Sequence, residues 1–166
     1  MARLVLVGLP GVGKSTLARA LAESWHCAMI DTDDLVARNV GVPVAQYLRE
    51  QGEAAFREKE LEALRSALNT DAVVATGAGV VVTSAARDLL GKEPTYWLDS
   101  DNETLLERVG DGERPLLGDD HREGLATLRS EREEWYHFSA RRRVDSSGTV
   151  DDVVQRIQRE VESVTP

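Results

Sequence analysis

The feature that most constrains the fold of this chain is a glycine-rich loop near its beginning. Residues 8–15 read GLPGVGKS and fit the pattern G-x-x-x-x-G-K-[ST] at every fixed position. An apolar run, LVLV, comes directly before the loop, and residues 15–25 carry apolar side chains at helical spacing after it. A strand, a loop and a helix in this order let backbone N–H groups and the positive end of the helix converge on a phosphate. The sequence therefore predicts a phosphate-binding loop.

The residue types in this loop have separate uses at a bound nucleotide. Glycine lets the backbone approach phosphate oxygens, Lys14 can neutralise the β- and γ-phosphates, and the Ser15 hydroxyl is the expected ligand of Mg²⁺. A glycine-rich turn beside a surface lysine is the alternative, but it leaves the flanking strand and helix unexplained. We predict that a nucleotide is bound here by Gly11, Val12, Gly13, Lys14, Ser15 and Thr16.

Short apolar runs alternate with segments of helical spacing along the rest of the chain. We expect strands at residues 3–7, 27–30, 72–75, 95–98 and 142–144, and helices at residues 15–25, 35–38, 44–49, 52–68, 84–90, 102–109, 123–138 and 149–164. This alternation predicts one α/β domain over residues 1–166, with a mostly parallel sheet and helices on both faces. The polar, Gly-rich stretch at residues 110–122 interrupts the pattern and predicts a mobile loop.

The charge and composition of the chain exclude several classes of protein. Its 166 residues include 20 Lys and Arg against 29 Asp and Glu, so a general binder of nucleic acid or of anionic membranes is not expected. No apolar run reaches the roughly 18 residues of a membrane-spanning helix. The first strand follows the N-terminus without the layout of a secretory signal, and the single cysteine, Cys27, cannot form an internal disulfide. We therefore expect a cytoplasmic protein.

Two aspartates follow the second predicted strand. Asp31 and Asp33 lie where open α/β sheets bind ligands, and the alternation of a strand turns both side chains the same way. One carboxylate could support a metal ion while the other accepts a proton from an attacking hydroxyl. A solvated acidic turn that caps the next helix is an equally good interpretation. A GTPase is not expected, because the chain lacks N-K-x-D and its D-x-x-G at residues 88–91 falls in a predicted helix.

Four further patterns follow in order along the chain. Residues 52–60 read GEAAFREKE and fit G-E-x-x-F-R-x-x-E, residues 76–79 read TGAG, residues 114–117 read RPLL, and residues 131–136 read EREEWY with the form x-R-x-x-x-Y. Together with the phosphate-binding loop and the two aspartates, this order closely resembles that of the shikimate kinases. The resemblance extends over residues 4–161, which is nearly the whole chain.

The resemblance implies an activity and a fold. Shikimate kinases transfer the γ-phosphate of ATP to the 3-hydroxyl of shikimate with the help of Mg²⁺, in the biosynthesis of chorismate and the aromatic amino acids. Their P-loop NTPase fold is similar to that of nucleoside monophosphate kinases, with a five-stranded parallel sheet of order 2-3-1-4-5 flanked by helices. For this chain the resemblance implies a single-domain monomer, a shikimate-binding region at about residues 31–60 and a mobile lid at about residues 110–122.

On the nucleotide side, the resemblance assigns roles to three residues outside the phosphate-binding loop. Asp31 would support Mg²⁺ together with Ser15, and Arg114 would swing in from the lid toward the phosphates that Lys14 contacts. Arg108 matches a position that can stack on adenine. Residues 145–149 read DSSGT and lack the arginine or proline that often contacts adenine in the family, so adenine contacts there are expected to rely on the backbone.

On the acceptor side, Asp33 would bind the shikimate hydroxyls and act either as the base for the 3-hydroxyl or as the group that orients it. Arg57 and Arg132 would clamp the carboxylate, because a planar guanidinium binds two oxygens at once. Each arginine has an ordinary alternative as half of a surface ion pair on its helix. The turn Gly77-Ala78-Gly79 would offer backbone N–H groups. The family usually has glycine at position 78, and a positive φ at Ala78 would store strain of roughly 1 kcal/mol.

Two other functions fit part of the sequence. A kinase of another small hydroxy acid, such as gluconate, shares the phosphate-binding loop but is not expected to carry the G-E-x-x-F-R pattern or the paired arginines. A nucleotide-binding regulator that has lost catalysis is expected to lack Asp33 or Arg114, and both are present. We therefore expect an ATP- and Mg²⁺-dependent shikimate kinase.

Overall fold

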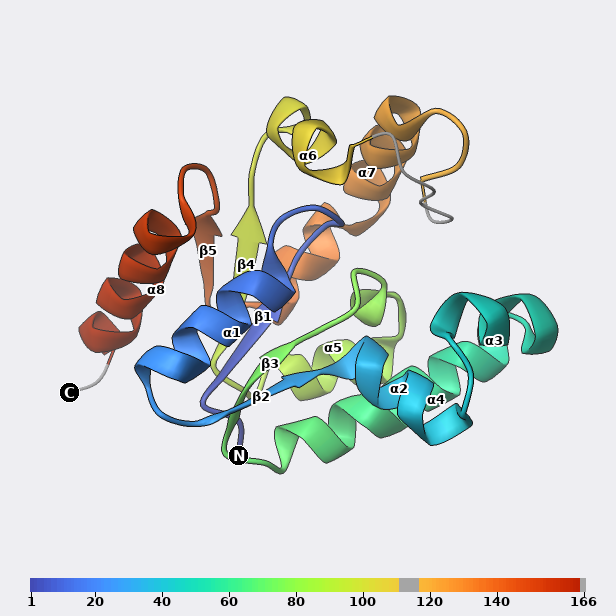
Figure 1. Cartoon of the computed structure of the whole chain (residues 1–166), viewed down its shortest axis with the longest axis horizontal. Coiled ribbons are helices and arrows are strands. Elements are labelled where there is room, and N and C mark those ends of the chain that lie inside the picture. The colour runs from blue at the N-terminus through green and yellow to red at the C-terminus, as the bar shows by residue number, and fades with distance from the viewer. Residues whose placement is uncertain (111–116, 165–166) are drawn as a thin grey trace.

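The computed structural model describes residues 1–110 and 117–164, and its centre is a five-stranded sheet (Figure 1). The paired strands all run parallel, in the order β2-β3-β1-β4-β5. The strands are β1 (Leu4–Val7), β2 (Ala28–Asp31), β3 (Ala72–Ala75), β4 (Thr95–Asp99) and β5 (Arg142–Asp145). The predicted parallel sheet, and the strand order that the resemblance implied, are confirmed.

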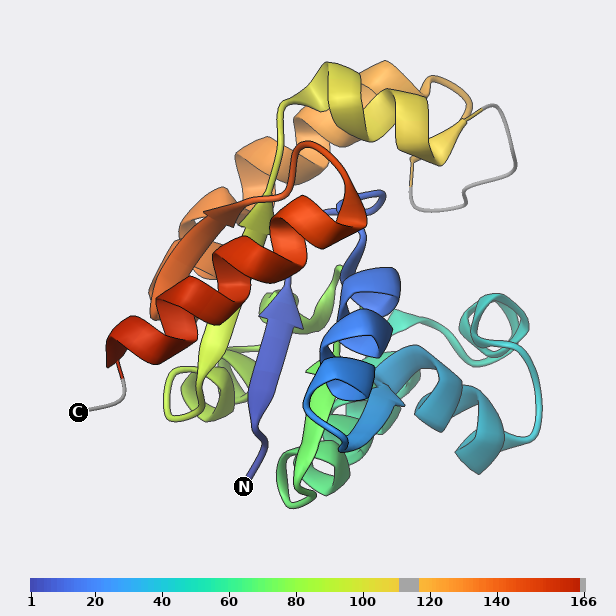
Figure 2. The same ribbon diagram turned by 60° about the vertical axis from the view of Figure 1, so that its left-hand side comes forward.

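Helices cover both faces of this sheet. They are α1 (Lys14–Ser24), α2 (Thr32–Val40), α3 (Val44–Gln51), α4 (Glu53–Leu68), α5 (Ser84–Leu90), α6 (Asn102–Val109), α7 (His121–Ser139) and α8 (Val150–Val164), with a short 3-10 helix, η1, at Val80–Val82. Figure 2 shows α1 and α8 side by side in front of the sheet, while α4, α5 and α7 pack behind it. α2 and α3 pack on α4 beside β2, and α6 packs on α7. Within the described residues, no helix could span a membrane.

Two helices begin earlier than apolar spacing predicts. Spacing placed their starts at residues 35 and 123, whereas α2 begins at Thr32 and α7 at His121. In each case the aspartate directly before the helix, Asp31 or Asp120, accepts hydrogen bonds from backbone amides of the first turn. The capping side chains therefore extend both helices toward the site that is described below.

Two groups of buried apolar side chains hold these elements together. All four residues of β1 are fully buried, as expected for a central parallel strand that is covered on both faces. A second, smaller cluster of Val36, Phe56 and Ala63 lies between α2 and α4. This cluster fixes α2 against α4, so that residues from both helices face the edge of the sheet.

Parallel pairing brings the carboxyl ends of β1, β2 and β3 to one edge of the sheet. Ala75 at the end of β3 pairs with Leu6 on one side and with Asp31 on the other, so the loops after these strands start side by side. The loop after β1 begins at Gly8, where an added Cβ would lie 2.4 Å from the carbonyl oxygen of Leu98. Glycine is required at Gly8 by the close approach of β4, as well as by a phosphate.

A buried carboxylate joins β4 to its neighbours. The side chain of Asp99 is 2% exposed and accepts hydrogen bonds from Arg129 Nη1 on α7, at 3.0 Å, and from Arg143 Nη2 on β5, at 2.5 Å. The Arg143 guanidinium also lies over the ring of Trp97, 5.0 Å from its centroid. Asp99 therefore ties the edge strand and α7 to the centre of the sheet.

We predict that Asp99→Asn lowers the free energy of unfolding by about 2–4 kcal/mol, because it leaves the half-buried guanidinium of Arg129 without its counter-charge; Arg143 is 61% exposed and contributes less. Urea unfolding at pH 7 measures this loss. The matched control is Asp71→Asn, whose partner Arg3 is exposed and 2.6 Å away, and which should move the unfolding midpoint only slightly. Equal midpoints for the two variants would contradict the role given to Asp99.

Candidate active site

The phosphate-binding loop joins β1 to α1, as predicted. Gly13 precedes the helix with a φ of 96°, a left-handed conformation that glycine adopts at low cost. The Lys14 side chain folds back over the loop and donates to the carbonyl oxygens of Gly8, at 2.8 Å, and Leu9, at 3.1 Å. Burial lowers the pKa of Lys14 to about 8, although Asp33 and Asp31 act in the opposite direction.

Two oxygen ligands lie together at the start of α1. The Ser15 hydroxyl donates to Asp31 Oδ2 at 2.5 Å, and Asp31 Oδ1 accepts from the amide of Asp33 at 2.9 Å. Asp31 therefore caps α2, as one interpretation of the acidic turn predicted, and it also reaches the phosphate-binding loop; its role at a metal ion stays a prediction. A hydroxyl and a carboxylate beside a phosphate site fit the oxygen preference of Mg²⁺.

Asp33 lies against the turn that follows β3. A Cβ added at Gly77 would be 2.6 Å from Asp33 Oδ1, so the carboxylate reaches this close only because position 77 is glycine. The Gly77 amide donates to Thr32 Oγ1 at 3.2 Å, which holds the turn to α2. Burial is the main cause that raises the pKa of Asp33, and the charge of Asp31 raises it further. A carboxylate with a raised pKa is suited to accept a proton.

Arg57 reaches the same turn from α4. Its Nη1 donates to Glu60 Oε2 at 2.7 Å, and a Cβ added at Gly79 would lie 2.5 Å from that nitrogen. Glu60 is 2% exposed, and burial raises its pKa while the neighbouring Arg57 lowers it. The i,i+3 pair on the helix therefore exists, but it is buried and aims the guanidinium at the turn.

Arg132 brings a second guanidinium to this region from α7. The residue is 6% exposed, and neither its Nε nor its Nη1 has a hydrogen-bond partner in the described part of the chain; the same is true of Arg57 Nε. Both arginines lie close enough to Glu60 to lower its pKa. Buried, unpaired donors on cations are costly, and an anion that accepted their hydrogen bonds would remove that cost.

The turn itself is held by Tyr136, which also lies on α7. The Tyr136 hydroxyl donates to the carbonyl oxygen of Ala78, and its ring stacks on Trp97 with centroids 6.1 Å apart. Burial raises the pKa of Tyr136 to about 12, so the hydroxyl stays protonated as a donor. Ala78 is 8% exposed and does not have a positive φ, so its methyl group adds no backbone strain.

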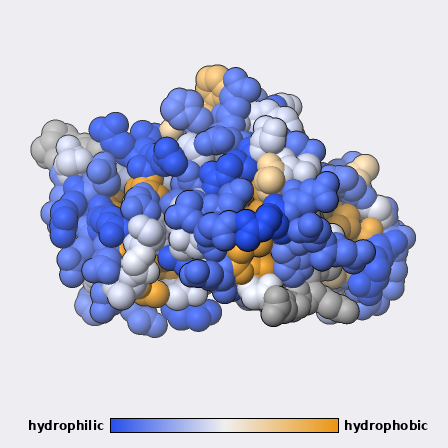
Figure 3. Space-filling view, turned by 90° about the horizontal axis from the view of Figure 1, so that it is seen from above, coloured by the Kyte–Doolittle hydropathy of each residue, from blue (hydrophilic) through white to orange (hydrophobic). Residues whose placement is uncertain are grey.

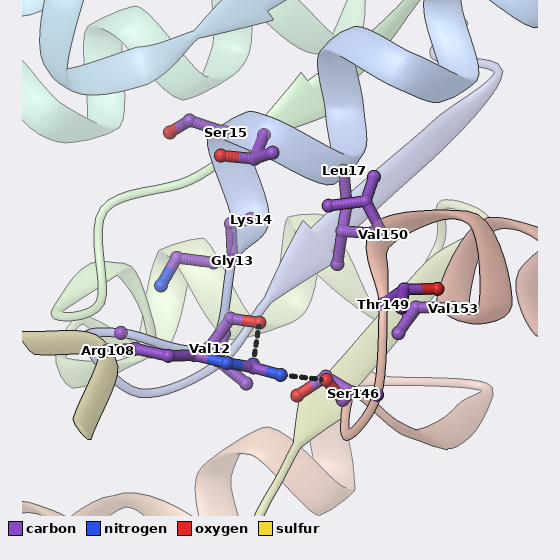
Figure 4. A pocket seen from close by; sticks show the side chains of 13 residues that line it. Val12, Gly13, Lys14, Ser15, Leu17, Arg108, Ser146, Thr149, Val150 and Val153 are labelled. Carbon is purple, nitrogen blue, oxygen red and sulfur yellow. Dashed lines mark hydrogen bonds between the residues drawn. The ribbon is translucent and has the colours of Figure 1, made fainter. Parts of the chain in front are cut away.

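A pocket of about 440 Å³ opens beside the phosphate-binding loop (Figure 4). Its lining includes the predicted nucleotide residues Gly11 to Thr16 and Arg108. Arg108 donates to the carbonyl oxygens of Val12, at 3.3 Å, and Ser146, at 2.6 Å, and thus bridges the loop and the turn before α8. Arg114, the predicted lid residue, lies outside the described residues.

Several residues of the site were not assigned a role from the sequence. In the pocket these are Leu17 of α1 and Val150 and Val153 of α8, whereas Ser146, Gly148 and Thr149 lie in the segment at residues 145–149 that was expected to contact adenine through its backbone. In the acceptor region Glu60 and Tyr136 were part of recognised patterns, but their contacts with Arg57 and Ala78 were not predicted. The i,i+3 spacing of Arg57 and Glu60 was the available signal for the first pair. No local signal indicates a contact across 58 positions.

The lowered pKa of Lys14 predicts a pH dependence of nucleotide binding. The free protein loses this proton as the pH rises above about 8, whereas a bound triphosphate favours the protonated amine. Affinity for a non-hydrolysable ATP analogue with Mg²⁺ should therefore fall between pH 7.5 and 9.5, approaching about tenfold per pH unit. Isothermal titration calorimetry measures the profile.

The matched variant for this experiment is Lys14→Arg. Its guanidinium stays protonated throughout the range, so its affinity should vary much less with pH, whatever its absolute value. A wild-type affinity that is constant from pH 7.5 to 9.5 would contradict the assignment of Lys14.

Comparison with known proteins adds a family match to this geometry. Residues 10–162 match the family described as shikimate kinase. The shikimate kinase of Corynebacterium jeikeium (strain K411) is 39% identical over 136 residues, which cover 81% of this chain and 74% of that protein. The structure of shikimate kinase from Acinetobacter baumannii in complex with shikimate superposes with a TM-score of 0.91 at 29% identity, covering 96% of this chain and 92% of the other.

A gluconokinase was also found among the solved structures. The protein, from Sinorhizobium meliloti 1021, has a TM-score of 0.60 and is 17% identical, over 97% of this chain and 91% of its own. A likeness at this level shows the fold that the two proteins share and carries no argument for gluconate as the acceptor.

Proposed function

This chain belongs to the shikimate kinase family, and on that basis we propose how its residues divide the transfer of the γ-phosphate of ATP to the 3-hydroxyl of shikimate. The observation that carries the proposal is the buried guanidinium of Arg132, whose Nε and Nη1 have no hydrogen-bond partner among the residues that the structure describes. Arg132 lies one helical turn before Tyr136, whose hydroxyl contacts the turn after β3. An anionic oxygen, such as that of a carboxylate, is the group that would accept hydrogen bonds from buried guanidinium donors. Arg57, fixed by Glu60, would contribute a second cation to the same carboxylate.

The hydroxyl face of the acceptor would meet Asp33 and the turn Gly77-Ala78-Gly79. In this arrangement Asp33 accepts the proton of the 3-hydroxyl while the oxygen forms its bond to the γ-phosphorus. The bond between that phosphorus and the bridging oxygen of ADP breaks in the same displacement, and ADP leaves with the electron pair. The raised pKa of Asp33 favours its role as proton acceptor, because it brings the carboxylate closer to the basicity that the transfer needs.

The nucleotide would occupy the pocket beside the phosphate-binding loop. Lys14 would give up its hydrogen bonds to the loop carbonyls and pair with phosphate oxygens instead. Ser15 and Asp31 would hold Mg²⁺, which neutralises charge on the phosphates when it is bound. Arg114 remains our prediction for a further cation on the transferred phosphate.

We also propose that the enzyme works in the cytoplasm as a monomer. Its single cysteine is compatible with a reducing compartment. Figure 3 shows the molecule from above, and this face is mainly hydrophilic with small, separate apolar areas, which is typical of a surface that is not an obligate interface.

The acceptor is tested first with the wild-type protein. A coupled assay of ADP release should give turnover with shikimate and much slower turnover with gluconate or with nucleoside monophosphates. The paired arginines suit a ring acid, because the ring holds the carboxylate and the reacting hydroxyl at a fixed separation, and the open chain of gluconate does not. Faster turnover with gluconate than with shikimate would overturn the proposal.

The proton acceptor is tested by a pair of neighbouring variants. Asp33→Asn should lower kcat with shikimate on the order of 10²-fold or more, because an amide cannot take the hydroxyl proton. Asp34→Asn is the matched control, since Asp34 is exposed on the same helical turn and should retain wild-type turnover. Near wild-type turnover of Asp33→Asn in this assay would rule out the role of Asp33.

A further inference from the structure

The turn between β5 and α8 forms one wall of the nucleotide pocket. Ser146, Gly148 and Thr149 of this turn line the pocket, together with Val150 and Val153 of α8. Figure 4 shows this wall opposite the phosphate-binding loop, with Arg108 between them. Because an exposed turn with glycine at its centre has many conformations, something must hold this wall in place before a nucleotide can pack against it.

Arg108 holds Ser146 from inside the pocket, and Arg156 holds the neighbouring residues from outside it. Arg156 lies on α8 and does not line the pocket, yet its Nη1 donates to two carbonyl oxygens of the turn. The distances are 3.0 Å to the oxygen of Asp145 and 2.6 Å to the oxygen of Ser147. Hydrogen bonds from a charged donor are stronger than neutral ones, so a single side chain fixes both halves of the turn.

The remaining polar groups of the turn support the same conformation. The Thr149 amide donates to Asp152 Oδ2 at 3.0 Å, and the Asp152 amide donates to Thr149 Oγ1 at 3.2 Å, which is a reciprocal cap at the start of α8. Gly148 has a φ of 91°, and a Cβ there would lie 3.0 Å from that Asp152 oxygen. The turn is thus closed by the cap at one end and by Arg156 across its middle.

We propose that Arg156 is a positioning residue for ATP, which preorganises the wall of the pocket that receives the adenosine part of the nucleotide. The inference rests on the proposed function only in taking ATP as the occupant of this pocket. Without the two hydrogen bonds from Arg156, the turn would be mobile in the free protein. Nucleotide binding would then have to order it, and the entropic cost would weaken the affinity for ATP. The reacting phosphate binds at the other side of the pocket, at Lys14, so the chemical step should be unaffected.

The support by Arg156 matters more in this chain because of the sequence of the turn. Residues 145–149 offer no arginine or proline to an adenine ring, so contact must come from the backbone and from apolar side chains such as Val150 and Val153. Backbone contacts depend on where the chain lies rather than on side-chain reach. A turn that binds adenine through its backbone therefore needs contacts that fix its conformation, and Arg156 provides two of them.

The test compares Arg156→Gln, which keeps most of the side-chain stem, with Arg159→Gln on the same helix. Arg159 is exposed, and its contact is with Gln155 of its own helix. For Arg156→Gln we expect the KM for ATP, and the Kd for a non-hydrolysable ATP analogue by calorimetry, to rise about fivefold to twentyfold. The kcat and the KM for shikimate should stay within about twofold of wild type, and Arg159→Gln should match wild type throughout.

Two further measurements separate positioning from general damage. Hydrogen exchange at the amides of Ser147 and Gly148 should be faster in Arg156→Gln, whereas exchange in β1 should not change. Arg156→Lys, which keeps a charged donor, should recover most of the lost affinity. If Arg156→Gln does not fold, Arg156→Lys carries the test: any loss of affinity for the analogue must be accompanied by faster exchange at Ser147 and Gly148, and a loss of affinity with unchanged exchange would overturn the inference.

An unchanged Kd for the analogue in Arg156→Gln would overturn the inference, and so would an equal loss of affinity for ATP and shikimate. The Kd of the analogue is measured without shikimate, so it does not depend on the proposed function. A wild-type protein that bound the analogue but did not phosphorylate shikimate would refute the proposed function and leave the role of Arg156 standing.

Discussion

Parallel pairing of β1 with β3, and of β3 with β2, is the constraint on which the site depends. It places the ends of these three strands at one edge, so that the segments after Val7, Asp31 and Ala75 start side by side. These segments bring the phosphate-binding loop, the aspartates Asp31 and Asp33, and a turn of small residues together. Because all three are attached to the buried core, their separations are set by the sheet.

The net charge of the chain is the second constraint. A negative protein repels anionic ligands, so cations near the site must make the local potential positive. The chain has a formal net charge of -9, while ATP and shikimate are both anions. Two buried cations lie in this region and attract anions locally. Burial lowers the pKa of Lys14 to about 8. Arg132 is 6% exposed, and two of its nitrogens have no hydrogen-bond partner among the described residues. Low exposure strengthens the attraction of these groups for an anion, since less water competes with it. The same burial makes them unfavourable without a ligand.

The sequence predicted the phosphate-binding loop and the fold class, but it did not predict the contacts that hold the site residues in place. The phosphate-binding loop and the α/β class follow from local patterns, whereas the strand order and the roles of Arg57 and Arg132 came from the family resemblance. Apolar spacing missed the first turn of α2 because Asp31 caps it, a polar effect. The contacts of Tyr136 with Ala78 and of Arg156 with Ser147 join residues that only the tertiary fold brings together. Such contacts leave no periodic signal in a single sequence.

The central claim is that buried arginines at the sheet edge recognise the carboxylate of the acceptor. The most direct measurement compares kcat/KM for shikimate with kcat/KM for its methyl ester, which keeps the ring and hydroxyls but removes the negative charge. The account predicts that the ester is poorer by on the order of 10²-fold or more, because the donors of Arg132 would stay buried and unpaired beside it. Equal values for the acid and the ester would contradict the account.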